Sequence, residues 1–553
     1  MGAESTELGN LATVKADASP VISEPESPVD TQSKRDYVDN DQLARMGKKQ
    51  VLRRNFGFMS ILGFSCTILI TWEAITVLFA QGLLNGGTAG VIYSYLIVWV
   101  GNISVFSTMC ELASMAPTSG GQYHWVAMLA PRSSAKFLSY ITGWLAVGGW
   151  QGSVASSSLL TGRMILGLIC LNNPDFQPKD WQGTLLFWAI LFFAVFINTL
   201  VSSALPKFEG LILILHILGF FGILIPLLVL GPRASTAEEI FTTFANEGMW
   251  PTQGLSFMVG MMGNVFAFVG TDAAFHMAEE THNPSVVVPR SIMMSIVING
   301  TCGFAMLLTM VFRMGGMDGF LAAASTGPGA LQFPFMSIFQ NAVQNLPAAT
   351  FMVIIIMVLG ACATVGMLAS TSRVFWSFAR DRGLPFWPTL SKIDPRTTVP
   401  IWAVGATSVI SILLSLINIG SNVAFQNVVS LSISCLYFSY IIAGSLLLYR
   451  RCTSGFSMPD ASGLPALANT TGAELVWGPF HLPGIFGILN NAFALIYLIT
   501  ISFFSFWPMM NNADPANVNF SVLVTGFIIL FSTVYYFIWA KKEYNGPIVE
   551  MEN

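Results

Sequence analysis

The sequence predicts an all-α polytopic membrane protein, and two observations support this fold class. Of the 553 residues, 54% are hydrophobic and only 10% are charged, whereas about 25% are charged in an average soluble domain. Apolar runs of about 20 residues, long enough to cross the hydrocarbon core of a bilayer, recur along the chain after Phe56. The bilayer is therefore the solvent in which the rest of the sequence has to be interpreted.

Twelve such runs follow one another. Inside a bilayer a helix pairs all its own backbone groups, so we expect each run to form a transmembrane helix. Their approximate cores are 59–84, 90–112, 137–169, 183–202, 208–230, 254–279, 291–314, 348–375, 401–418, 424–449, 485–507 and 519–540.

Positive charge is distributed unevenly between the loops that join these runs. Most Lys and Arg residues lie before the first run or in loops on the same side, and only Lys179, Arg233 and Arg313 lie in loops on the other side. The positive-inside rule therefore predicts that both termini are cytosolic. We expect the plasma membrane, with the vacuolar membrane as the alternative. The net charge of −4 is small and gives no indication of a nucleic-acid partner.

The segments outside the apolar runs are predicted to be cytosolic. Residues 1–55 include SPVISEPESPVDTQSKRD, which is rich in Ser, Pro and acids, and this composition predicts a disordered N-terminal tail. Residues 453–484 form a cytosolic loop and residues 541–553 a cytosolic C-terminal tail.

Two of the runs have polar residues or glycine at their centres. The first run contains TWEA at 71–74, and the sixth contains Gly270, Thr271 and Asp272. In hydrocarbon a helix is interrupted only where it lines a cavity enclosed by protein. Transporters built from inverted repeats have such breaks in matching spans of their two halves. A pairing of spans 1 and 6 would give a repeat of five helices.

Four segments carry a family resemblance. They are ELASMAPTSGGQYHW at 111–125, FVGTDAAFHMAEETHNPSVVVPRS at 268–291, STSRVFWSFARDRGLP at 370–385, and TWEA followed by LLNGG. In these segments the chain resembles the amino acid–polyamine–organocation (APC) superfamily, and within it the amino-acid/choline transporter branch known mainly from fungi. The resemblance implies a LeuT-like 5+5 inverted repeat of twelve transmembrane helices with broken helices 1 and 6.

The resemblance also implies how the chain is divided. Residues 56–232 would hold helices 1–5 as the first repeat, residues 233–452 helices 6–10 as the second, and residues 485–540 helices 11 and 12. The substrate site it implies comprises Trp72, Glu73 and Ala74 in the unwound part of span 1, Gly270, Thr271 and Asp272 in that of span 6, Phe266 and Phe268 one turn earlier, and Gln151 on span 3. Relatives have small residues where Trp72 and Glu73 stand, so this sequence departs from the family there.

The ionisable residues of this set have alternative interpretations. Asp272 could cap the half-helix that follows it, and Glu73 could lie in the first turn of the second half of span 1. His216 could be a hydrogen-bonded core residue. By the resemblance, its position is that of a lysine on span 5 of proton-dependent relatives, so His216 and Asp272 are the candidates for proton coupling. His276 is the competing proton carrier.

Two further acids, Glu279 and Glu280, are interpreted as structural residues paired with Arg290 or nearby basic residues.

Charge favours one substrate class. Two like charges about 4 Å apart cost roughly 4 kcal/mol at an effective dielectric near 20, so an ionised Glu73 opposes a substrate carboxylate. Aromatic residues near a buried acid suit a quaternary ammonium group. We therefore expect a secondary active transporter that imports choline or a related cation by alternating access, coupled to a proton. An amino-acid or 4-aminobutyrate permease is the alternative, and sodium coupling remains open.

Other classes of protein are less consistent with the sequence. An enzyme needs a convergent nucleophile–base or metal constellation, which five scattered histidines and seven isolated cysteines do not offer. No cofactor or metal is expected. A nutrient sensor built on a transporter fold is the alternative from another class, because sequence does not report flux.

Overall fold

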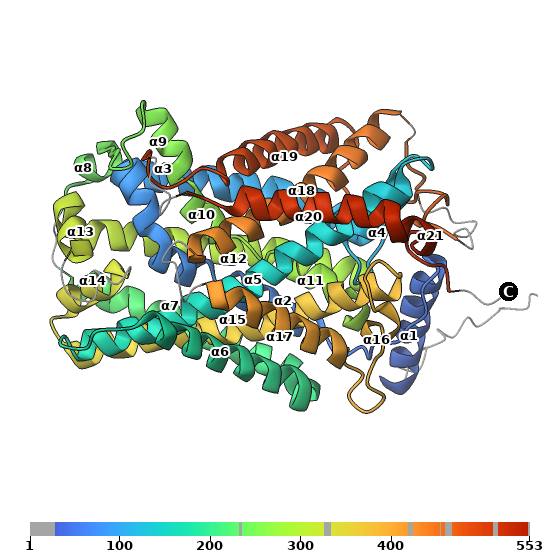
Figure 1. The fold of residues 1–553 in the computed structure, drawn as a ribbon, viewed down its shortest axis with the longest axis horizontal. Coiled ribbons are helices and arrows are strands. Elements are labelled where there is room, and N and C mark those ends of the chain that lie inside the picture. The colour runs from blue at the N-terminus through green and yellow to red at the C-terminus, as the bar shows by residue number, and fades with distance from the viewer. Residues whose placement is uncertain are drawn as a thin grey trace, which may run out of the picture.

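The computed structural model describes residues 28–231, 235–325, 333–417, 424–453, 455–458, 467–512 and 518–550. This part of the chain forms an elongated bundle in which most long helices follow the longest axis (Figure 1). Nine helical segments in it are long and apolar enough to cross a membrane. The chain is thus a multi-pass membrane protein.

Each expected apolar run lies on one or more helices. The long ones are α2 (Phe58–Leu69), α3 (Thr71–Met115), α5 (Ala135–Asn172), α6 (Asp180–Leu200), α7 (Leu205–Leu230), α12 (Pro284–Arg313), α15 (Leu346–Arg380), α17 (Ile401–Leu416), α18 (Ala424–Thr453), α19 (Gly484–Phe504) and α20 (Ser521–Tyr535). The run at 254–279 is divided among α9 (Gln253–Gly260), α10 (Met262–Phe266) and α11 (Ala273–His276).

Shorter elements occupy the connections. They are α1 (Pro28–Arg45), α4 (Gln122–Leu129), α8 (Ala237–Thr242), α13 (Gly316–Ser325), α14 (Pro334–Val343), α16 (Trp387–Leu390), α21 (Lys541–Glu543), the 3₁₀ turns η1 (Ser202–Ala204) and η2 (Ala278–Glu280), and the π-helical turn η6 (Tyr536–Ala540).

Helix α3 contains the second part of the first expected run and all of the second, and Gly87 lies between them. This residue has φ 68° and ψ −169°, outside the helical region. A Cβ atom there would lie 2.6 Å from the carbonyl oxygen of Thr243, so both the backbone conformation and the close approach require glycine. Gly87 is therefore the point at which α3 is kinked, and the two spans lie on either side of it.

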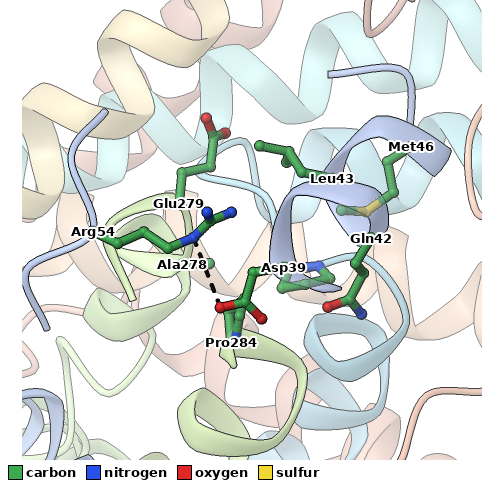
Figure 2. Close-up of a pocket in the computed structure, with 9 residues that line it drawn as sticks. Asp39, Gln42, Leu43, Met46, Arg54, Ala278, Glu279 and Pro284 are labelled. Atoms are coloured by element: carbon green, nitrogen blue, oxygen red, sulfur yellow. Dashed lines mark ion pairs between the residues drawn. The ribbon is translucent and has the colours of Figure 1, made fainter. Parts of the chain in front are cut away.

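The N-terminal segment differs from the disordered tail predicted for residues 1–55, because Pro28–Arg45 form α1. Leu43 and Met46 are buried, and the Asp39 carboxylate accepts a hydrogen bond from the Asn283 backbone at 2.9 Å. Figure 2 shows this end of α1 facing Arg54 and Pro284. The prediction rested on Pro and acid content, whereas a few apolar residues on one face dock the helix. Residues 1–27 lie outside the described residues.

The two ends of the described chain meet at one end of the bundle, which we call the terminal end (Figure 1). The Glu550 carboxylate accepts hydrogen bonds from Arg380 at 2.6 and 2.5 Å, and its backbone N–H donates to Gly47 at 2.6 Å. Asp381 accepts from both Lys48 and the Ile548 backbone. Burial raises the pKa of Glu550, but Arg380 outweighs this and holds it below its usual range. This contribution to docking is therefore present near neutral pH and lost in acid.

Two more ion pairs close the terminal end. Arg373 Nε donates to Glu280 Oε1 at 2.7 Å, and Arg380 Nη1 lies 3.0 Å from Glu279 Oε2. The basic partners of the two glutamates are thus residues of α15, whereas Arg290 is exposed. Since both glutamates follow α11 directly, these pairs tie the second half of the sixth span to α15.

We predict that Arg373→Met destabilises the protein by about 3–5 kcal/mol, because it leaves the buried Glu280 carboxylate without its cation. Thermal unfolding of purified protein in detergent measures the effect. The matched control is Arg45→Met, since Arg45 pairs with Asp41 but its side chain is 25% exposed, and such pairs contribute at most about 1 kcal/mol. Equal losses in the two variants would contradict the prediction.

Candidate functional site

The first interruption within a span lies at Ile70. This residue has φ 32° and ψ 44°, in the left-handed region, and separates α2 from α3. A β-branched residue is rare in this conformation, so the surrounding structure has to hold it there. Such strained backbone is concentrated at binding and switching sites.

The break lies slightly earlier than the sequence analysis predicts. Trp72, Glu73 and Ala74 were assigned to the unwound segment, but they form the first turn of α3 and are buried. The alternative interpretation of Glu73, a first-turn position in the second half of the span, is the observed one. There the carboxylate complements the positive end of the helix dipole. The break is short because a single residue in the left-handed conformation, Ile70, separates α2 from α3.

Asn299 of α12 spans this break. Its Oδ1 accepts from the Thr71 backbone N–H and its Nδ2 donates to the Cys66 carbonyl oxygen, both at 3.4 Å. One side-chain amide therefore contacts backbone groups on both sides of the interruption. Sequence analysis missed this residue. An Asn within an apolar run was the available signal.

Glu73 and His216 form a buried pair. Glu73 Oε1 lies 2.6 Å from His216 Nδ1, and the two side chains are 2% and 0% exposed. The other acceptor, Glu73 Oε2, and the other ring nitrogen, His216 Nε2, have no hydrogen-bond partner in the described part of the chain. The Trp72 ring lies 5.7 Å from the imidazole, centre to centre. The structure thus brings together three residues that the sequence analysis singled out separately.

The second interruption lies between α10 and α11. Residues 267–272 form turns, and Gly270 has φ 98°. A Cβ atom on Gly270 would lie 3.0 Å from Ile68 Cγ2 and 3.7 Å from the Ile68 carbonyl oxygen. Ile68 is two residues before the break in the first span. The two interruptions are therefore in contact inside the bundle.

Asp272 is the centre of a second buried cluster. Its Oδ2 accepts hydrogen bonds from Gln122 Nε2 at 2.9 Å and Trp150 Nε1 at 3.2 Å, and it lies 3.7 Å from His276 Nε2. Asp272 occupies the N-cap position of α11 but makes no side-chain capping bond. Its Oδ1 has no hydrogen-bond partner in the described residues. The capping interpretation of Asp272 is therefore wrong for its side chain.

His276 is held in one orientation by the loop before α4. Its Nδ1 lies 3.0 Å from the Ser119 carbonyl oxygen. A carbonyl oxygen only accepts, so Nδ1 is the donor in this contact and Nε2 is the nitrogen that faces Asp272. Gly121, with φ 54°, allows the loop to approach the His276 ring closely, because a Cβ atom on residue 121 would lie 3.1 Å from the imidazole.

The remaining predicted residues line the surroundings of the breaks. Thr271 donates to the Phe268 carbonyl oxygen at 2.7 Å and so stabilises its own turn. The Phe268 ring packs 5.6 Å from Tyr95, and Phe266 is half-buried. Gln151 donates to Thr407 at 3.0 Å, whereas its neighbour Trp150 is the residue that contacts Asp272.

Besides Asn299, Gln122 and Trp150 are site residues that sequence reasoning did not assign. Gln122 lies in the ELASMAPTSGGQYHW segment, which signalled the family without indicating a contact with span 6. Trp150 was not singled out, because the helix face it occupies depends on the tertiary arrangement. The available signals were the position of Gln122 within a family motif and the position of Trp150 next to Gln151.

Chemically, the two clusters are alike. Each combines one carboxyl group with one imidazole, away from water, beside an interrupted helix. An ionised carboxylate with a neutral imidazole leaves one uncompensated buried negative charge, which is costly. A proton or a cationic ligand removes that charge. No group of three potential metal ligands occurs in the part of the chain that the structure describes.

A polytopic helical bundle with two touching interruptions and buried ionisable pairs defines a membrane transport protein. The sequence profile described as "Amino acid permease" matches residues 56–530, so the chain belongs to the amino acid permease family. Members of this family are permeases and not enzymes.

Several curated relatives align over nearly the whole chain. A choline transporter from Saccharomyces cerevisiae is 30% identical over 91% of this chain and 84% of its own length. The amino-acid permease BAT1 of Arabidopsis thaliana is 27% identical, with 92% and 96% covered. Amino-acid permease 2 of Neurospora crassa is 25% identical, with 92% and 88% covered.

We predict that Gly270→Ala destabilises the protein by roughly 1–3 kcal/mol, because alanine rarely adopts a positive φ and its Cβ would press on Ile68. The measurement is the melting temperature of the purified variant. Gly254→Ala is the matched control, since nothing lies within 4 Å of a Cβ there and its φ is not positive. A wild-type melting temperature for Gly270→Ala would contradict the prediction.

Proposed function

We propose that the protein is a secondary active transporter that imports a small amine or amino acid, with choline or a related cation favoured, by alternating access coupled to a proton. The observation that carries this proposal is the contact between the two interruptions, each of which has a buried carboxyl–imidazole pair beside it. A substrate bound there would meet both halves of the chain, so movement of one half against the other would change the side from which it is accessible.

The proposed architecture is the twelve-helix, LeuT-like 5+5 inverted repeat with the boundaries given above. Interruptions in the first and sixth runs of an ordered series of twelve support it, because a five-helix repeat relates those two runs. The proposed orientation has both termini cytosolic, in the plasma membrane, so that the terminal end of the bundle faces the cytosol. The charge distribution of the loops supports this orientation.

The proposed substrate contacts are Trp72, Glu73, Ala74, Gln151, Phe266, Phe268, Gly270, Thr271 and Asp272. Glu73 Oε2 and Asp272 Oδ1 are buried acceptors without a partner in the described chain. Such atoms favour a ligand that is cationic or donates hydrogen bonds. The tryptophan and phenylalanine rings nearby suit a quaternary ammonium group.

The pairing of Glu73 with His216 changes the electrostatic argument for substrate choice. When His216 is neutral, Glu73 is a negative charge that attracts a cationic head. When His216 is protonated, the pair is neutral overall and the repulsion of a substrate carboxylate is reduced. Protonation would therefore decide how well the site accepts a zwitterion, and this supports a proton as the coupling ion.

The names of the relatives support both substrate classes. The 30% identical relative named as a choline transporter supports a cation, and those named as amino-acid permeases support an amino acid or 4-aminobutyrate. A nutrient sensor without flux would bind but not accumulate the substrate. Accumulation of labelled substrate in proteoliposomes distinguishes a transporter from a sensor. Competition by choline, betaine, 4-aminobutyrate, basic amino acids and polyamines identifies the substrate.

We predict that His216→Gln abolishes accumulation driven by a pH gradient and leaves substrate binding measurable. Glutamine keeps a hydrogen bond to Glu73 but does not take up a proton in this pH range. Uptake into proteoliposomes with and without an inward proton gradient measures the effect. The control is His481→Gln, since His481 lies in a connecting segment and contacts the Gly478 carbonyl oxygen. Unchanged pH-driven accumulation in His216→Gln would shift the role to Asp272 and His276.

We predict that Glu73→Gln lowers the affinity for choline by roughly ten- to a hundredfold, because a charge-assisted contact contributes about 1.5–3 kcal/mol. Affinity for a neutral amino acid should fall less, since the variant also loses repulsion toward the carboxylate. Dissociation constants for both ligands, on protein of matched melting temperature, provide the comparison. Equal affinities in wild type and variant would exclude Glu73 as the counter-ion.

A further inference from the structure

A third buried carboxyl group lies on the same helix as His216. Glu209 of α7 is 1% exposed. The Thr67 hydroxyl group donates to its Oε2 at 2.6 Å, and its Oε1 has no hydrogen-bond partner in the described chain. A Cβ atom on Gly366 of α15 would lie 3.6 Å from Oε1, so the carboxyl group is enclosed between α2, α7 and α15.

The elements packed against α7 place no cation on Glu209. They are α2, α12, α14, α15 and η1, together with α3 through its Glu73–His216 contact. Elements α14 and η1 have no charged or titratable residue, and α3 has Glu73, Tyr93, Tyr95, Cys110 and Glu111 but no basic residue. The titratable side chains of the others, with those of α7, are Cys66 on α2, Arg290, Cys302 and Arg313 on α12, Cys362, Arg373 and Arg380 on α15, and Lys207 and His216 on α7. Of these, Cys362 is near enough to interact electrostatically with Glu209.

The basic side chains of that set are engaged or directed elsewhere. Arg373 and Arg380 pair with glutamates at the terminal end, and Arg313 donates to carbonyl groups at the opposite end of α7. Arg290 and Lys207 are exposed. An ionised carboxylate that is buried with no cation beside it is strongly disfavoured, so the surroundings of Glu209 favour its protonated form.

The position of Glu209 connects the Glu73–His216 pair to the terminal end. Glu209 and His216 are two helical turns apart on one face of α7, about 10 Å along its axis. Glu209 contacts Thr67 of α2, which starts at Phe58 beside the terminal end, whereas His216 contacts Glu73 beyond the break. A displacement of α2 would remove Thr67 from Glu209 and admit water.

We propose that Glu209 is a second proton-transfer residue, through which the coupling proton leaves toward the terminal end. This inference rests on the proton coupling proposed above. When α2 moves away, the O–H bond of Glu209 breaks and its proton passes to water. The carboxylate left behind takes a proton, through intervening water, from the imidazolium of His216. Glu209 is then neutral again, His216 is neutral, and one proton has been released.

The test compares Glu209→Gln with wild type in proteoliposomes that contain a pH-sensitive dye, with labelled choline as the probe and, where wild type does not take up choline, the most effective competitor of the panel. The amide is nearly isosteric but releases no proton. Substrate-driven proton movement should fall about a hundredfold, the usual loss when a positioned proton-transfer group is removed. Exchange of internal for external labelled substrate, which needs no net proton release, should continue.

Thr67→Val is the matched control, because it removes the hydroxyl group and keeps the carboxyl group. Proton movement should persist in Thr67→Val. If the Glu209–Thr67 contact served only to hold α2, both variants would lose exchange and proton movement together, and that result would overturn the proposal. Wild-type proton movement in Glu209→Gln would also overturn it.

A second measurement covers the case in which Glu209→Gln does not fold. An apolar carbodiimide modifies protonated carboxyl groups in membrane interiors, so mass spectrometry of treated wild-type protein should find Glu209 modified. Its absence from the modified residues would contradict the protonated state and thus the proposal. If wild type itself moves no protons with substrate, the proposed function fails. If wild type and His216→Gln behave as predicted and Glu209→Gln moves protons normally, only this inference fails.

Discussion

The requirement that a backbone interrupted inside an apolar bundle find hydrogen-bond partners outside its own helix governs much of this structure. The first interruption is bridged by a side-chain amide from α12, and the second is closed by the Thr271 hydroxyl group on a carbonyl of its own turn. Neither break would be stable facing lipid. Each backbone N–H or C=O group left unpaired in hydrocarbon costs on the order of several kcal/mol. The breaks therefore lie together in the interior, and the ionisable residues beside them are buried as a result.

Burial then determines the chemistry available to those ionisable residues. An imidazole beside a carboxylate is a site whose charge changes with one proton, and it occurs once at each break. The two pairs differ in what else they contact. Glu73 has the imidazole as its single hydrogen-bond partner in the described chain, whereas Asp272 also accepts from Gln122 and Trp150. The first pair is consequently held by fewer side-chain contacts than the second.

The course of the chain and the position of both interruptions could be predicted from the sequence to within a few residues. Apolar length identified the runs, and the glycine–threonine–aspartate triplet identified the second break because such residues are costly in a lipid-facing helix. The first break was placed slightly late, since Ile70 gives no signal of a left-handed conformation. The Glu73–His216 contact was not predicted because it joins residues 143 positions apart. Gln122 and Asn299 were missed for the same reason. The docking of α1 was also missed, because composition does not report a narrow apolar face.

The contacts between the N-terminal and C-terminal segments at the terminal end have a consequence for biosynthesis. They join Gly47 and Lys48, which precede the transmembrane helices, to a segment that contains Ile548 and Glu550 and is synthesised after those helices. The segment that contacts Arg380 and Asp381 is therefore absent while the helices before it are being inserted. Closure of that end requires synthesis of this segment, so a chain terminated before it would enter the membrane without these contacts, and its exposed end would be available to quality control.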